Sequence, residues 1–116
     1  MKTKNQIINF LILLLFISGC SSSKLENSTT TIPDVLNHFK ANGYVGEYDL
    51  KFFSLVGAIG GGSYIGDNFS FEIYQFDSPS KTKNMAAYKN CYQKGYFVIM
   101  VHRGNIEKIN EVFQRF

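Results

Sequence analysis

The stretch YFVIMVH, residues 96–102, decides the fold, because it is the most continuously apolar part of the chain outside the first twenty residues. Seven residues suit a strand better than a helix, and the β-branched and aromatic side chains favour a strand as well. Apolar residues at successive positions indicate that both faces of the strand are covered. The stretch therefore predicts the central strand of a sheet.

A neighbouring strand is predicted at residues 69–76, where side chains of two kinds alternate. Phe69, Phe71 and Ile73 fall on one face, whereas Glu72 and Tyr74 fall on the other. This period of two is typical of a half-buried antiparallel strand. A turn is predicted just before it, in the sequence Gly66-Asp67-Asn68.

A third strand is predicted over residues 49–59, and Gly60, Gly61 and Gly62 interrupt the pattern directly after it. A phosphate-binding loop would need the pattern Gly-x-x-x-x-Gly-Lys-Ser/Thr, or Gly-x-Gly-x-x-Gly, between a strand and a helix. Neither pattern is present. Because glycine adopts most backbone conformations, we expect a flexible turn or a bulge. A mobile loop beside a ligand groove is the alternative.

Three helices are predicted. The first covers residues 32–42, with Thr31 and Asp34 forming a capping pattern and Gly43 ending it. The second covers residues 79–94, with Ser78 as its N-cap. The third follows Asn105, and its apolar stripe consists of Ile106, Ile109, Phe113 and Phe116.

These elements predict one small α+β domain over residues 32–116, in the order α-β-β-α-β-α. The simplest arrangement is a three- or four-stranded, largely antiparallel sheet with the helices packed on one face. The chain shows no internal repeat and no second domain.

The first 19 residues have the character of a removable signal. Lys2 and Lys4 precede an apolar run over residues 7–17, which is too short to span a bilayer. The run ends in Ile17-Ser18-Gly19-Cys20, which resembles the lipobox of bacterial lipoproteins. The resemblance implies that Cys20 is lipidated and that the leader is cleaved immediately before it.

Two or three acyl chains on Cys20 would hold the protein persistently on a membrane. Ser21, in place of aspartate, resembles the outer-membrane signal of enterobacterial lipoproteins, so a Gram-negative cell would carry the protein on its outer membrane. A Gram-positive cell would carry it on the outer leaflet of the cell membrane. Residues 20–31 then comprise the lipidated Cys20 and a flexible tether, whose ten polar residues 21–30 reach at most about 35 Å.

Charge and cysteine content bear on nucleic-acid binding and on disulfide formation. Without the leader the chain has ten basic and nine acidic residues, so no basic surface for nucleic acid is expected. Cys91 has no intramolecular partner if Cys20 carries lipid. Its neighbours are spaced as on a helix face, which predicts a buried, inert thiol, with an intermolecular disulfide or a reactive thiol as alternatives.

No motif for catalysis, metal or cofactor binding is found, so we expect no enzyme, no metal and no cofactor. His38 is expected on the helix surface and His102 at the rim of the sheet. A metal site at His102 with Asp77 or Asp67 would lack the usual three or four ligands at coherent spacing. A carboxylate pair could be drawn from Glu47, Asp49, Glu72 and Asp77, but spacing favours none.

Tyrosines flank the glycine-rich segment, and we expect them to cover the small sheet; the alternative is an aromatic surface patch that includes Tyr64 and Tyr74. We therefore expect a non-catalytic, lipid-anchored envelope protein that binds an envelope protein partner. The alternative is a small-molecule or envelope-polymer binding protein using Gly60–Gly62 and the nearby tyrosines. An unrecognised hydrolase is a third possibility.

Overall fold

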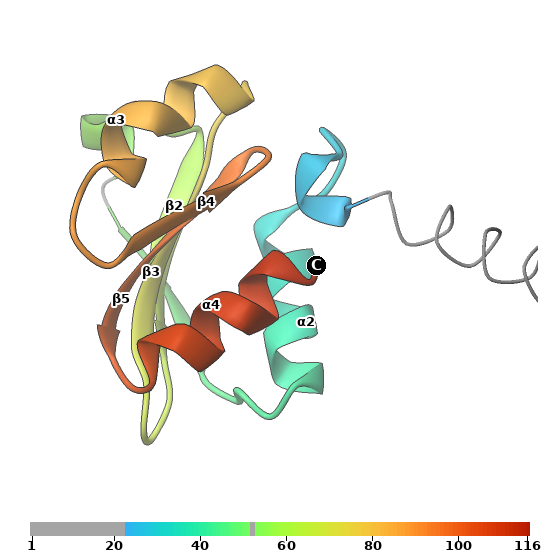
Figure 1. Ribbon diagram of the computed structural model, residues 1–116, viewed down its shortest axis with the longest axis vertical. Coiled ribbons are helices and arrows are strands. Elements are labelled where there is room, and N and C mark those ends of the chain that lie inside the picture. Colours follow the sequence, from blue (N-terminus) through green and yellow to red (C-terminus); the bar gives the residue numbers. More distant parts are fainter. Residues whose placement is uncertain (1–22, 52) are drawn as a thin grey trace, which may run out of the picture.

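The computed structural model describes residues 23–51 and 53–116, and its central element is a five-stranded antiparallel sheet (Figure 1). The strand order is β1-β2-β3-β5-β4. The α+β class is confirmed, but the prediction of three or four strands is wrong. The strands are β1 (Glu47–Leu50), β2 (Gly60–Ile65), β3 (Ser70–Gln75), β4 (Cys91–Lys94) and β5 (Phe97–Arg103).

The predicted apolar stretch forms β5, which pairs with β3 on one side and β4 on the other. Phe97, Val98 and Ile99 are fully buried, so both faces of this strand are covered as expected. The alternating segment forms β3, and a turn joins it to β2.

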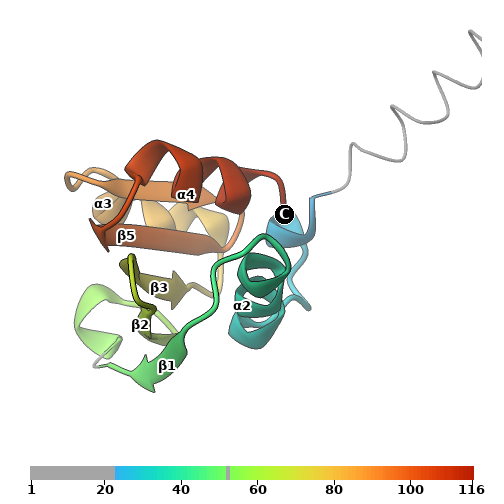
Figure 2. The ribbon, with the colours of Figure 1, turned by 90° about the horizontal axis from the view of Figure 1, so that it is seen from below.

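One face of the sheet is covered by α2 (Ile32–Ala41) and α4 (Ile106–Gln114), which pack against each other (Figure 2). Thr31 and Asp34 form the predicted capping box of α2, and Asn105 accepts a hydrogen bond from the Lys108 amide at the start of α4. Buried aromatic and aliphatic side chains from both helices join those of β3 and β5 in the main core.

The opposite face is also covered in part, so the prediction that all helices pack on one face is wrong. Short 3₁₀ helices η2 (Ser54–Val56) and η3 (Pro79–Thr82) and the single turn α3 (Lys83–Ala86) lie on that side. A second, smaller core there includes Tyr74, Phe76 and Met85.

The predicted helix over residues 79–94 is wrong beyond its first turns. Ser78 makes no capping hydrogen bond through its side chain, and α3 ends at Ala86. Asn90 then adopts a positive φ of 61°, which asparagine tolerates and a helix does not. The following residues form β4, because pairing with β5 satisfies their backbone groups.

The predicted strand over residues 49–59 is also wrong in its bounds. β1 ends at Leu50, and the chain then forms η2 before it enters β2 at Gly60. The three glycines are therefore strand residues. Gly61 faces the Tyr74 ring so closely that a Cβ at this position would lie 2.5 Å from Tyr74 Cδ1, which explains the absence of a side chain there.

The expected tether is structured from Ser23 onward. Residues Lys24–Glu26 form the 3₁₀ helix η1, and Leu25 is fully buried in the main core. The domain therefore begins about eight residues before its predicted start. The leader and Cys20 lie outside the described residues, and among residues 23–51 and 53–116 no helix is long and apolar enough to cross a membrane.

Candidate functional site

The two tyrosines considered for an aromatic surface patch lie in the interior. Tyr64 is 1% exposed and Tyr74 is 5% exposed, so neither offers its ring to a partner. The Tyr64 hydroxyl donates to Tyr44 O at 2.8 Å and accepts from Gly46 N at 3.0 Å, which ties the segment before β1 to the sheet. The alternative of an exposed patch at these residues is therefore wrong, and a part for them in binding stays a prediction.

Gly60, Gly61 and Gly62 do not form a loop beside a groove. They pair with β3 in register from Gln75 to Ile73, and Gly62 also pairs with Leu50 of β1. A Cβ on Gly62 would lie 2.3 Å from Asp49 O, so glycine allows β1 to approach closely. The segment therefore serves the packing of the sheet.

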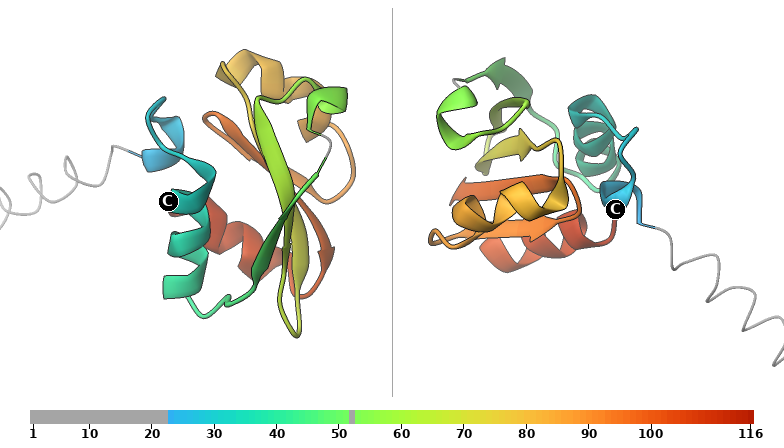
Figure 3. Two further views of the ribbon diagram at one scale, coloured as in Figure 1. Left: turned by 180° about the vertical axis from the view of Figure 1, so that it is seen from behind. Right: turned by 90° about the horizontal axis from the view of Figure 1, so that it is seen from above.

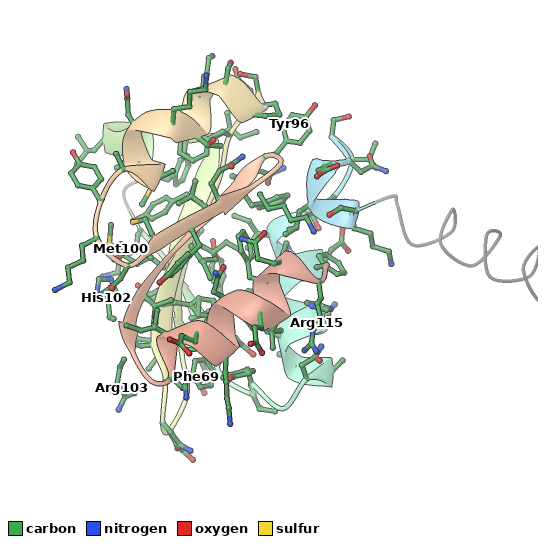
Figure 4. All side chains as sticks on the ribbon, viewed as in Figure 1. Phe69, Tyr96, Met100, His102, Arg103 and Arg115 are labelled. Atoms are coloured by element: carbon green, nitrogen blue, oxygen red, sulfur yellow. The ribbon has the colours of Figure 1, made fainter. Side chains whose placement is uncertain are left out.

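The most notable polar cluster joins Glu72, Tyr74 and His102 on one side of the sheet. The Tyr74 hydroxyl donates to Glu72 Oε1, and the His102 ring contacts Glu72 Oε2 through Nε2. Met100 and His102, alternate residues of β5, lie on the same side of the molecule (Figure 4). His102 thus lies at the sheet rim as expected, and Glu72 is its partner.

The surroundings change the proton affinities of this cluster. Burial raises the pKa of Glu72, but the hydrogen bonds from Tyr74 and His102 outweigh burial, and the net pKa is lowered. Burial and the neighbouring Glu72 carboxylate raise the pKa of Tyr74 well above its usual value. Glu72 is therefore a stable carboxylate and Tyr74 a stable hydroxyl, an arrangement suited to holding strands together rather than to moving protons near neutral pH.

His102 does not meet the aspartates considered as metal ligands with it. Asp77 accepts a hydrogen bond from Lys81 at 2.9 Å, and the backbone oxygen of Asp67 accepts one from Arg103. Within the described parts of the chain, no three His, Cys, Asp or Glu side chains are placed to hold a metal ion.

His38 is half-buried, so its expected position on the solvent-exposed surface is wrong. Its Nε2 lies 2.7 Å from Val112 O, and its ring stacks on Phe116 with centroids 4.5 Å apart. The ring therefore joins α2 to the end of α4. The sequence could not indicate this contact, because it depends on how the two helices pack.

Cys91 is buried as expected, although it begins a strand instead of lying within a helix. Burial raises the pKa of its thiol, and the Glu72 carboxylate adds to the rise. A thiol with a raised pKa is a poor nucleophile at neutral pH.

The surface most suited to binding is the free edge of β1. All four residues of the strand are exposed, and in the described part of the chain no strand pairs with its outer side. Lys51 N donates to Gly61 O at 3.2 Å, and backbone groups alternate in direction along an antiparallel pair. Tyr48 and Leu50 therefore direct their N–H and C=O groups away from β2.

Large apolar side chains gather around this edge. Leu50 is 72% exposed and Leu55 is 86% exposed. Other exposed aliphatic residues come from the adjoining segments, namely Val45, Val56, Ile59 and Ile65. Two open hollows adjoin β1, one lined by residues 45–49 and 65–67 and the other by residues 49–51 and Phe53. We call this surface the β1 edge.

The sequence contains one signal for the β1 edge. Leu50, Leu55, Val56 and Ile59 form an apolar segment without strict alternation, within the residues predicted as a strand. The structure ends the strand early and leaves these residues on the surface.

Comparisons with protein-family models, with curated protein sequences and with solved structures find no match to this chain.

Proposed function

We propose that the protein is a lipid-anchored, non-catalytic component of the bacterial cell envelope that binds a partner protein through the β1 edge. The observation that supports binding is the open edge itself, with outward backbone groups framed by exposed aliphatic side chains. Such an edge pairs readily with another chain, and several domains bind extended peptides in this way. The lipobox at Cys20 supports the anchor.

The partner segment is an extended strand with alternating aliphatic and basic side chains. Aliphatic side chains would cover Leu50 and Leu55, whereas basic ones would meet the acidic groups along the edge. These groups are Glu47, Asp49 and Asp67, which line or adjoin the larger hollow. Backbone hydrogen bonds would supply affinity, and the side chains would select the partner.

The ligand-binding alternative depends on a loop at Gly60–Gly62. These residues are paired within the sheet and do not form a loop. For the hydrolase alternative, the described residues offer the Glu72 cluster. Its carboxylate already accepts hydrogen bonds from Tyr74 and His102, and neither of the two hollows beside β1 is lined by it.

The test is site-specific photocrosslinking in intact cells, with a photoreactive amino acid at Leu50, Leu55 or Tyr88. Tyr88 is a matched control, because it is 64% exposed but lies between α3 and β4, near the other edge of the sheet. We expect the same protein to crosslink at positions 50 and 55 and not at 88.

The crosslinked protein is then purified and its affinity for two variants is measured. Leu50→Lys removes the aliphatic contact and adds a positive charge to an edge that the partner's basic side chains meet. Tyr48→Pro removes an N–H that points away from β2, so the backbone hydrogen bonds to β2 remain. We expect each to weaken binding at least tenfold. Equal crosslinking at all three positions, or unchanged affinity of both variants, would refute the β1 edge as the binding surface.

A further inference from the structure

The N-terminal segment of the described chain is fastened to the C-terminus. Lys24 N donates to Phe116 O at 2.7 Å, Ser23 Oγ donates to the same oxygen at 3.1 Å, and Lys24 Nζ lies 5.5 Å from the centre of the Phe116 ring. The chain is therefore held from Ser23 onward, at the end of the domain where α4 finishes.

The next residues fasten the segment to the sheet. Leu25 is 0% exposed, and its carbonyl accepts a hydrogen bond from Tyr96 N at 3.0 Å. Gly95 has a φ of +58°, and a Cβ there would lie 2.0 Å from Leu25 O. The β4–β5 turn thus leaves space for this segment only because residue 95 is glycine. Gln75 Nε2 donates to Thr30 O at 3.1 Å and holds its far end.

This attachment shortens the link to Cys20. Only Ser21 and Ser22 separate Cys20 from Ser23. Three residue steps span at most about 11 Å, whereas the tether expected from the sequence would reach about 35 Å. A lipidated Cys20 would therefore keep Ser23 within about 11 Å of the lipid-bearing residue.

The same attachment fixes which side faces the lipid. Leu25 contacts the turn between β4 and β5, whereas β1 lies at the opposite edge of the sheet. Four strand spacings separate the two edges, about 19 Å. Figure 3 shows residues 23–30 on one side of the domain and β1 and η2 on the other.

We propose that residues 23–30 seat the domain directly on the lipid surface in a fixed orientation. The side formed by this segment, the start of α2 and the C-terminus lies against the headgroups, and the β1 edge points away from them. The inference rests on the proposed lipidation of Cys20. It makes the envelope lipid a second binding partner and leaves the β1 edge free for protein.

The orientation is tested by energy transfer on the lipidated protein in phosphatidylcholine vesicles that contain a rhodamine-labelled lipid. In a Cys91→Ala background, one fluorescent donor is placed at Ser28→Cys or at Leu55→Cys, both exposed positions. We expect clearly stronger transfer from position 28 than from position 55. A ten-residue Gly-Ser insertion between Ser22 and Ser23 should remove most of this difference.

The experiment distinguishes failure of the lipid anchor from failure of the fixed orientation. If the protein carries no lipid and does not float with the vesicles, as expected for Cys20→Ser, the anchor fails and the inference fails with it. If the protein floats but positions 28 and 55 transfer equally, or if the insertion changes nothing, the anchor stands and the fixed orientation is refuted.

Discussion

The Glu72 carboxylate joins neighbouring strands through its side chain. It lies on β3, accepts a hydrogen bond from Tyr74 of the same strand, and contacts His102 of β5. Because Glu72 is largely covered, an unpaired charge there would be costly, and the two partners offset that cost. The stabilising effect of the cluster therefore depends on how far the Glu72 carboxyl group is ionised.

Replacing Glu72 with glutamine should destabilise the domain at neutral pH by about 1 kcal/mol, the difference between a charged and a neutral acceptor. The pKa of Glu72 is lowered on folding from its ordinary value of 4.5. Its ionised form therefore stabilises the fold above that value, and the contribution is lost as pH falls through 4.5 and below. Urea unfolding at pH 7 and pH 3 measures the difference between wild type and Glu72→Gln, which should shrink at the lower pH.

The control for this prediction is Glu111→Gln, on the exposed side of α4, which should change stability by less than about 0.5 kcal/mol. A difference between wild type and Glu72→Gln that is the same at both pH values would contradict the role given to the carboxylate. The sequence placed Glu72 and Tyr74 on one face by alternation. The register of β5 against β3, which brings His102 to Glu72, was not derivable from it.

At the scale of elements, the sequence correctly predicted the helices and strands for which the apolar periodicity and the capping or turn residues indicate the same structure. α2, α4, β3 and β5 each combine an apolar pattern with a recognisable cap or turn, and all four are present. The errors occur where tertiary pairing outweighs local pattern. Met85, Tyr88 and Cys91 have helical spacing, yet the free edge of β5 draws Cys91 into β4.

η1 is the element whose formation depends most on tertiary contacts. Its sequence is polar apart from Leu25, so composition alone predicts a flexible segment. One buried leucine and the hydrogen bonds to Phe116 and Tyr96 are what order it.

Leu25→Ala should therefore lower the free energy of unfolding by about 2–4 kcal/mol, since it leaves a cavity in the main core. Leu55→Ala removes the same atoms from an exposed site and should cost less than about 0.5 kcal/mol. Urea unfolding measures both. Hydrogen exchange at Tyr96 N–H should also quicken in Leu25→Ala alone, because that amide donates to Leu25 O. Equal effects of the two substitutions would show that η1 does not belong to the folded domain.

At the scale of the whole molecule, the two proposed surfaces lie on different sides of the domain (Figure 3) and share no residue. The lipid side is formed by residues 23–30 and the C-terminus, and the protein side by β1, η2 and the adjoining aliphatic residues. A rigid sheet separates them, so each surface can be disabled without altering the other. This separation distinguishes an adaptor between lipid and protein from a single apolar surface that serves both.

The two surfaces should therefore fail independently. Cys20→Ser should abolish flotation with vesicles and leave the affinity for the crosslinked partner unchanged within about twofold, because β1 is remote from residue 23. Leu50→Lys should do the reverse, keeping flotation and losing at least tenfold in affinity. Flotation assays and calorimetry on both variants and on the double variant measure this directly. If Leu50→Lys also reduced flotation, the β1 edge would itself contact lipid, because the aliphatic side chains around it would then be buried in the membrane instead of in a partner.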